Sequence, residues 1–235
     1  MTDMRRTITT AKSTTRAGAA DREKIGQLER FAVEHGAYRA RGFSARLVAF
    51  DERVKLKCQI PLCPHYGKTL TCPPNVPPLE EFVKAVQHYR TALLVQTRSA
   101  VTGDIAACDR EKVLAYVASA GASQKEKGGE KTGADKDLDA MKIAAIQLHK
   151  LVNEVERKAM SMGFPYALGL IGGECMLCQE CVGQGSGKSC RRPYEARPSM
   201  EGIGIDVIKT CDKAGLPFEL PPKQEIVWSG LIFID

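Results

Sequence analysis

The sequence predicts a single layered domain of the α/β or α+β class, with a mixed sheet, helices and two Cys-rich metal-binding loops. Strand-like and helix-like patterns alternate along the chain, which is typical of such layers. The 235 residues are enough to bury a hydrophobic core. A composition of 43% hydrophobic and 26% charged residues is that of a globular protein.

The chain is expected to begin with a basic tail and a short helix over residues 1–37, followed by the metal-binding domain at 38–235. Residues 1–18 carry four bases and one acid and lack the apolar run of a secretory signal, so we favour a solvated tail over a transit peptide. The helix that follows has Asp21 as its cap, apolar residues at helical spacing and Gly36 at its end.

The next elements are two strands with a helix between them. Residues 43–50 alternate apolar and polar side chains, as a half-buried strand does. Residues 77–89 predict a helix, because they begin with Pro in the first turn and place acids near the positive end of the helix dipole. Residues 91–97 have an apolar centre and predict a buried strand.

A polar segment and a long helix follow. Residues 121–137 are mostly Gly, Lys and acidic residues, and we interpret them as a solvated insertion. Residues 138–162 place apolar side chains at a three–four spacing, which is compatible with a coiled coil but favours an ordinary helix against the core. The strand candidate at 166–171 leads directly into the second Cys-rich segment.

The C-terminal part is predicted to contain a helix and a strand. The helix covers 199–215, with Ser199 as its cap and Gly215 at its end. We interpret it as a support for the Cys-rich loop that precedes it. The last strand covers 225–235, with a hairpin about Ser229–Gly230 as an alternative to one continuous strand.

Composition and charge exclude several functions. The net charge is +6, but aromatic residues make up only 6% of the chain and do not alternate with bases, so nucleic-acid binding is not expected. No apolar run reaches the roughly 18 residues of a membrane span. The chain is expected to be cytoplasmic, and its nine cysteines then favour metal binding or redox chemistry over disulfides, because the cytosol keeps thiols reduced.

The densest cysteine cluster lies in the sequence GGECMLCQECVGQGSGKSC, and its members are Cys175, Cys178, Cys181 and Cys190. Two residues separate each of the first three, so one curled loop can place three thiolates on three irons of a 4Fe-4S cluster. The fourth cysteine would take the remaining corner. Zinc sites are usually built from two separate cysteine pairs, and a zinc knuckle with one spare thiol is the alternative.

The residues around this cluster fit an anionic metal centre. Its glycines allow close backbone approach, so that backbone N–H groups can point at sulfur. Lys188, Arg191 and Arg192 belong to the stretch 188–197, which carries four bases and one acid. We expect these bases to offset the negative charge of a thiolate-bound cluster. An anionic partner is the other explanation for them.

A second cluster lies in the sequence CQIPLCPHYGKTLTCPP. Its cysteines are Cys58, Cys63 and Cys72. Two of them are followed by Pro, which removes a backbone donor and stiffens the chain beside a ligand. The cluster predicts a second metal site whose fourth ligand is Cys108, Cys211, His65 or a position open to water or substrate. We interpret His65 as the partner of a ligand, and the two isolated cysteines as buried side chains.

The two clusters, in this order, give the chain a family resemblance. CPHYGKTLTCPP and GGECMLCQEC, with CRRPYEARPSMEGIGIDV behind the second, resemble sequences of the Cys-rich predicted metal-binding proteins of anaerobic bacteria and archaea. The resemblance covers most of the chain after Tyr38. It implies metal binding, with the seven cysteines of the two clusters as ligands, and it implies no known reaction.

We therefore expect an iron–sulfur protein that transfers electrons or supports a reductive reaction, together with a redox partner protein or a small-molecule substrate. One 4Fe-4S cluster is expected at the second Cys-rich segment and a further metal at the first. A zinc-binding structural or interaction module is one alternative. A metal chaperone or sensor, which hands metal on from exposed thiolates, is the other. The sequence identifies no catalytic residue.

Overall fold

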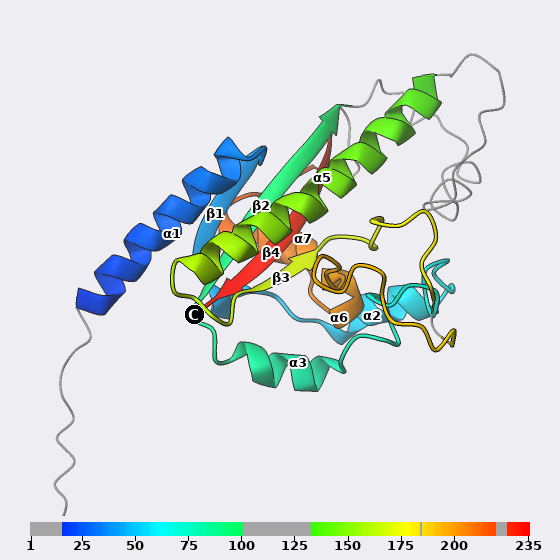
Figure 1. Cartoon of the computed structure of the whole chain (residues 1–235), viewed down its shortest axis with the longest axis horizontal. Coiled ribbons are helices and arrows are strands. Elements are labelled where there is room, and N and C mark those ends of the chain that lie inside the picture. The colour runs from blue at the N-terminus through cyan, green and yellow to red at the C-terminus, as the bar shows by residue number, and fades with distance from the viewer. Residues whose placement is uncertain (1–15, 101–132, 184, 220–224) are drawn as a thin grey trace, which may run out of the picture.

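A four-stranded sheet forms the centre of the structure, with helices against both of its faces (Figure 1). The computed structural model describes residues 16–100, 133–183, 185–219 and 225–235. The predicted α+β class is confirmed. The helices and strands in chain order are α1 (Arg16–Glu34), β1 (Arg39–Ser44), the 3₁₀ turn η1 (Ala45–Leu47), α2 (Glu52–Gln59), α3 (Leu79–Val86), β2 (Thr91–Ala100), α5 (Gly133–Ser161), β3 (Leu168–Ile171), α6 (Met200–Ile203), α7 (Val207–Ala214) and β4 (Glu225–Ile234).

The strands lie in the order β1-β2-β4-β3, and each neighbouring pair is antiparallel. The central strands β2 and β4 pair along their whole length, from Thr91 opposite Ile234 to Ala100 opposite Glu225. The mixed sheet expected from the sequence is thus an antiparallel one within the described ranges. The side-chain pattern of a strand does not set the direction of its neighbour, so the sequence pattern did not distinguish the two.

Each face of the sheet has its own layer of buried side chains. On one face α1 and α5 contribute Leu28, Leu148 and Val152, none of which is exposed. On the other face α3 and α6 contribute Phe82 and Ile203, and α7 adds further apolar residues. Successive residues of β2 and β4 point alternately into these two layers, so the central strands are buried on both faces.

The first two elements differ from their predicted boundaries. Helix α1 begins at Arg16 rather than at Asp21, because the preceding Ala-rich residues continue the helix. The strand expected over 43–50 lies earlier, as β1, and ends at Ser44. Ser44 pairs with Thr91, the first residue of β2, so the partner strand offers nothing further to pair with and the chain turns into η1.

The C-terminal elements also differ from prediction. The expected helix is two short helices, because Gly204 ends α6 in the left-handed conformation, with a φ of 104°. Strand β4 runs unbroken through Ser229 and Gly230, so there is no hairpin at this point. A Cβ on Gly230 would lie 2.5 Å from a methyl group of Val152. Close packing of α5, not a turn, therefore accounts for this glycine.

The predicted long helix is present as α5, which crosses the sheet obliquely (Figure 1). Val152, Val155 and Ala159 are fully buried against the sheet, as expected for an ordinary core-facing helix. Helix α5 begins within the predicted insertion at 121–137, and the first part of that insertion lies outside the described residues, as does Cys108. No described helix combines the length and the apolar character needed to cross a membrane.

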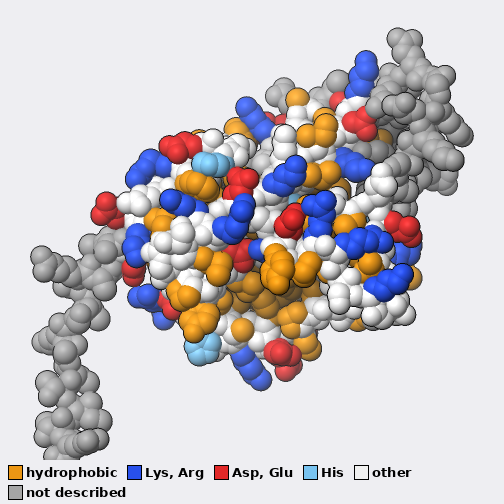
Figure 2. Space-filling view, viewed as in Figure 1, with side chains coloured by type: hydrophobic (Ala, Val, Ile, Leu, Met, Phe, Trp, Pro, Cys, Tyr) orange, Lys and Arg blue, Asp and Glu red, His pale blue; other side chains and the backbone are white. Residues whose placement is uncertain are grey.

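Charged side chains of both signs cover much of the face in Figure 2, around a hydrophobic hollow near its lower centre. Lys and Arg side chains are prominent toward the side on which Figure 1 shows α2 and the Cys-rich segments. The same part of the molecule exposes large apolar side chains: Leu56 in α2, and Ile60 and Leu62 directly after it.

Candidate metal centre

The second Cys-rich segment leaves the sheet at the end of β3. Gly172 donates its amide hydrogen to the carbonyl of Ser229 on β4 at 2.9 Å, and a Cβ on this glycine would lie 2.7 Å from the same oxygen. Gly173, with a φ of 78°, then turns the chain and donates to Glu201 at 3.1 Å. A side chain at Gly172 would prevent this close contact, so the glycine pair fixes where the cysteine loop starts.

The four cysteines of this segment surround one space. Cys175, Cys178, Cys181 and Cys190 all line the same small cavity. Arg191 and Arg192 line it from within the segment, whereas Leu70 and Thr71 close it from the first Cys-rich segment. The first segment therefore supplies part of the wall around the C-terminal thiols, which the sequence did not reveal.

Backbone N–H groups point at two of these sulfur atoms. Cys175 accepts a hydrogen bond from the amide of Leu177, and Cys190 Sγ accepts one from the amide of Arg192 at 3.3 Å. Burial raises the pKa of Cys175 to about 11, and the neighbouring thiols add to the shift. The thiolate form therefore needs a positive partner at this position, which a bound metal supplies.

The three bases expected beside the cluster take different positions. Arg191 turns back and donates to the carbonyl of Glu180 at 2.6 Å, which closes the cysteine loop on itself. Arg192 pairs with Glu195 at 3.0 Å. Both arginines line the cavity of the four cysteines, whereas Lys188 is exposed and does not. The two arginines are thus the bases placed to offset negative charge there.

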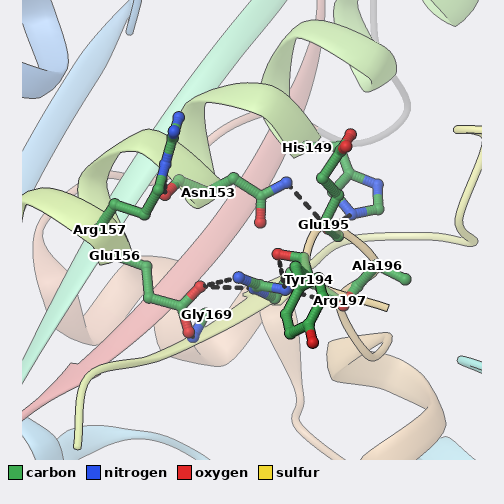
Figure 3. A network of polar contacts seen from close by, with 9 residues as sticks. All are labelled: His149, Asn153, Glu156, Arg157, Gly169, Tyr194, Glu195, Ala196 and Arg197. Atoms are coloured by element: carbon green, nitrogen blue, oxygen red, sulfur yellow. Dashed lines mark hydrogen bonds and ion pairs between the residues drawn. The ribbon is translucent and has the colours of Figure 1, made fainter. Parts of the chain in front are cut away.

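A polar network joins the end of this segment to α5 (Figure 3). The carbonyl of Glu195 accepts hydrogen bonds from His149 Nε2 at 2.9 Å and from Asn153 at 2.8 Å. Arg197 forms a buried ion pair with Glu156, and its Nε lies 2.5 Å from Oε2. Burial lowers the pKa of His149 to about 4, so the imidazole is neutral at neutral pH. The sequence did not indicate this network, because the residues it joins are 41 to 46 positions apart.

The first Cys-rich segment folds back on itself after α2. Cys58 lies in the last turn of α2, and its carbonyl accepts from the amide of Cys63 at 3.0 Å. The amide of Gly67 donates to the carbonyl of Pro73 at 2.8 Å, which closes the loop. Burial raises the pKa of Cys58 and raises that of Cys72 to about 12, and in both cases nearby thiols of the same segment add to the shift. The three thiols thus form one electrostatic group.

A buried side-chain pair connects the two Cys-rich segments. His65 Nε2 lies 3.5 Å from Oε1 of Glu174, and both side chains are nearly enclosed. His65 belongs to the first segment, and Glu174 directly precedes Cys175 in the second. The histidine that we predicted to be the partner of a ligand therefore lies beside a carboxylate of the other segment.

A second carboxyl group, that of Glu201 in α6, borders the first segment. Cys58 and Glu201 line the same cavity. Oε2 of Glu201 accepts hydrogen bonds from the amide of Gly173 at 3.1 Å and from the hydroxyl of Ser199 at 3.0 Å. Burial raises the pKa of Glu201, and these hydrogen bonds oppose the shift. Ser199 caps α6 as predicted, and in doing so it also holds this carboxyl group.

Of the two isolated cysteines, Cys211 lies in the core. It is fully buried in α7, its thiol donates to the hydroxyl of Ser229 at 3.5 Å, and it accepts from the amide of Gln96 at 3.7 Å. It therefore packs as the small buried side chain that the sequence favoured.

Iron–sulfur clusters and zinc ions place different demands on a set of thiols. A cubane distributes four thiolates over four irons, so it needs four thiols around a cavity. Zinc needs its ligands gathered on one ion. Within the described residues of both Cys-rich segments, no three His, Cys, Asp or Glu side chains are grouped as ligands of a single ion. The C-terminal group provides four thiols that line one cavity.

An α+β domain with two groups of free thiols beside the end of a strand defines a cysteine-rich protein of the metal-binding class. The chain belongs to the DUF2284 family of predicted metal-binding proteins, whose family profile matches residues 41–234. The matched range includes both Cys-rich segments, so the resemblance to a predicted metal-binding family is confirmed. Comparisons with curated proteins and with solved structures gave no match.

Proposed function

We propose that the protein holds a 4Fe-4S cluster on Cys175, Cys178, Cys181 and Cys190, and that it transfers electrons or supports a reductive reaction. The observation that supports this most directly is that the four thiols line one cavity. A bound cluster would supply one-electron redox chemistry at this position. The chain would supply the thiolates, the neighbouring arginines and the walls that limit access of water.

The surroundings of the four thiols support a cluster in three ways. Backbone amides donate to two of the sulfurs, and such hydrogen bonds tune the reduction potential of a cluster. Arg191 and Arg192 lie at the cavity and favour an anionic group there. Leu70 covers the cavity from the first segment, and an apolar cover restricts solvent.

The first segment is proposed to hold a separate metal. Cys58, Cys63 and Cys72 form their own electrostatic group. A cubane is held by four thiolates, so a single cubane would leave three of the seven clustered cysteines without a metal. Cys211 is buried in the core and is not placed to be the fourth ligand. The candidates that remain among the described residues are His65 and a position open to water or substrate. The adjacent carboxyl group of Glu201 adds a further oxygen donor beside Cys58.

A redox partner protein is proposed to contact the surface around α2. Leu56, Ile60 and Leu62 are 50%, 74% and 68% exposed, and three of the eight residues of α2 are bases. Exposed apolar side chains with a basic rim fit an acidic partner that approaches close to Cys58. The cytoplasm is the proposed location, because its reducing conditions keep thiols available for metal.

The test is anaerobic purification followed by assays of iron, acid-labile sulfide and zinc on the same sample. The proposal expects iron and sulfide in equal amounts and a brown protein. Zinc without sulfide would contradict the cluster and would favour a zinc-binding structural or interaction module. Metal that is lost reversibly to micromolar chelator would favour a chaperone or sensor.

A cysteine substitution then tests the ligands. Cys178→Ser should remove most of the iron and the visible absorbance, because it removes one corner of the cube. Cys211→Ser is the matched control, since it changes a buried thiol outside both groups and should retain the iron. An unchanged spectrum and iron content in Cys178→Ser would contradict the ligand assignment.

The second site is tested by replacing Cys58, Cys63 and Cys72 together with Ala. If the two groups hold separate metals, the visible spectrum of the C-terminal cluster should persist while total metal falls. Loss of all metal in a variant that stays folded by circular dichroism would mean that both groups share one site. Loss of none would mean that the first segment is a Cys–Pro loop without metal.

A further inference from the structure

A cavity of about 490 Å³ lies beside Cys58, between α2, α7 and β4, and the four C-terminal cysteines are not part of its lining. Its lining comes from six separate parts of the chain, which meet only in the folded protein. Apolar side chains form most of the wall: they include Val54, Ile205, Phe218, Val227 and Trp228. The volume is within the range of about 300 to 1,000 Å³ that is typical of small-molecule sites.

Four polar side chains interrupt the apolar wall, in addition to Ser229, whose hydroxyl is hydrogen-bonded to Gln96 and Cys211. Cys58 and Lys57 come from the last turn of α2, Glu201 from α6, and Asp206 from the residue that caps α7. Two carboxyl groups thus face one ammonium group, and Lys57 is exposed at the surface. Acidic residues thus outnumber basic ones in the lining, which favours a cationic ligand over an anionic one.

Glu201 is the polar residue held most firmly. The amide of Gly173 and the hydroxyl of Ser199 both donate to its Oε2, so the side chain is fixed in one position. A carboxylate has about four acceptor positions over its two oxygens, and the backbone amide of Glu201 itself is a third donor, so one position is left to accept from a ligand. A preorganised acceptor at the edge of an apolar cavity is the usual means by which a site orients a small molecule.

We propose that this cavity binds a small organic amine with an apolar, ring-containing body, with the amino group toward Glu201 and the ring against Trp228. An aromatic wall suits a ring by stacking and suits a nearby cation by its negative face. The location next to Cys58 puts the ligand beside the first cysteine group, so a molecule bound here would be in position to respond to a metal held there.

The chain contains a single tryptophan, and that residue lines the cavity. Its fluorescence therefore reports on this site and on no other. We would titrate the protein as isolated with benzylamine, and in parallel with benzyl alcohol and benzoate. Benzylamine should give a saturable change in emission. Benzyl alcohol should bind at least about tenfold more weakly, because a charge-assisted hydrogen bond contributes about 1.5 kcal/mol or more.

Two substitutions test the orientation. Glu201→Gln keeps the size of the side chain and should weaken benzylamine binding at least about tenfold. Glu80→Gln, on the exposed surface of α3, is the matched control and should leave binding unchanged. Ile208→Arg, at a lining residue that is 46% exposed, adds positive charge without disturbing the core and should also weaken binding.

Three results would overturn the proposal: no saturable response to benzylamine, binding of benzoate as tight as that of benzylamine, or equal binding by Glu201→Gln and the parent protein. Calorimetry would repeat the measurement, since a coloured metal centre absorbs emitted light. Calorimetry does not depend on the colour of the metal that is present. An amine site in a protein that contains zinc and no iron would therefore refute the proposed iron–sulfur function and leave this inference standing.

Discussion

The burial of the His149 imidazole should make the folded state sensitive to acid. The imidazole has a pKa near 6.5 in the unfolded chain, and burial lowers it to about 4 in the folded protein. Between these values the unfolded chain binds a proton that the folded protein does not, so stability is full above pH 6.5 and falls as the pH drops toward 4. The whole effect is about 3 kcal/mol, of which about 2 kcal/mol is lost between pH 7.5 and pH 5.0.

The assay is urea unfolding at these two pH values, on samples whose iron and zinc contents are the same before and after the change of pH. Carboxylates elsewhere also titrate, so the parent protein is compared with His149→Gln, whose amide can still donate but does not titrate. The parent should lose about 2 kcal/mol more than the variant over this interval. Equal losses in the two proteins would refute the reasoning, because the buried imidazole would then contribute nothing to the pH dependence.

Three further substitutions test the packing around the site by urea unfolding at pH 7.5. Arg197→Ala leaves Glu156 buried without its partner and should cost about 3 to 5 kcal/mol, whereas Arg98→Ala, which breaks an exposed ion pair, should cost less than about 1 kcal/mol. Gly230→Ala should cost about 1 to 3 kcal/mol, because its Cβ meets α5 at 2.5 Å. Ser199→Ala removes the cap of α6 and should cost about 1 to 2 kcal/mol. A loss below about 0.5 kcal/mol in any of the three buried variants would contradict the contact assigned to it.

Local patterns predicted the elements well where one physical signal dominated. The spacing of apolar residues in α5 and the Ser199 cap both depend on a few neighbouring residues, and both are present. Gly230 misled the prediction, because a glycine that admits a neighbouring helix is indistinguishable in sequence from one that makes a turn.

Of the candidate site, the sequence indicated only which cysteines could lie together. The spacing of the four C-terminal cysteines indicated that one loop could carry them, and they line one cavity. The wall that Leu70 and Thr71 add, and the contact between His65 and Glu174, depend on how two distant segments pack. No local pattern encodes such contacts, so they became visible only in the folded chain.

The shared wall between the two Cys-rich segments limits what can be transplanted from this protein. The carbonyl of Thr71 accepts from the amide of Ser199 at 3.1 Å, so the first segment is hydrogen-bonded to the residues that follow the C-terminal loop in the sequence. A synthetic peptide copying residues 172–193 would carry all four thiols but not this backing, and neither would a loop grafted onto another scaffold. Its thiols would be open to water and oxygen on the side that Leu70 lines here. A transplant that keeps the thiols enclosed must therefore include both Cys-rich segments and the part of the sheet to which they are attached.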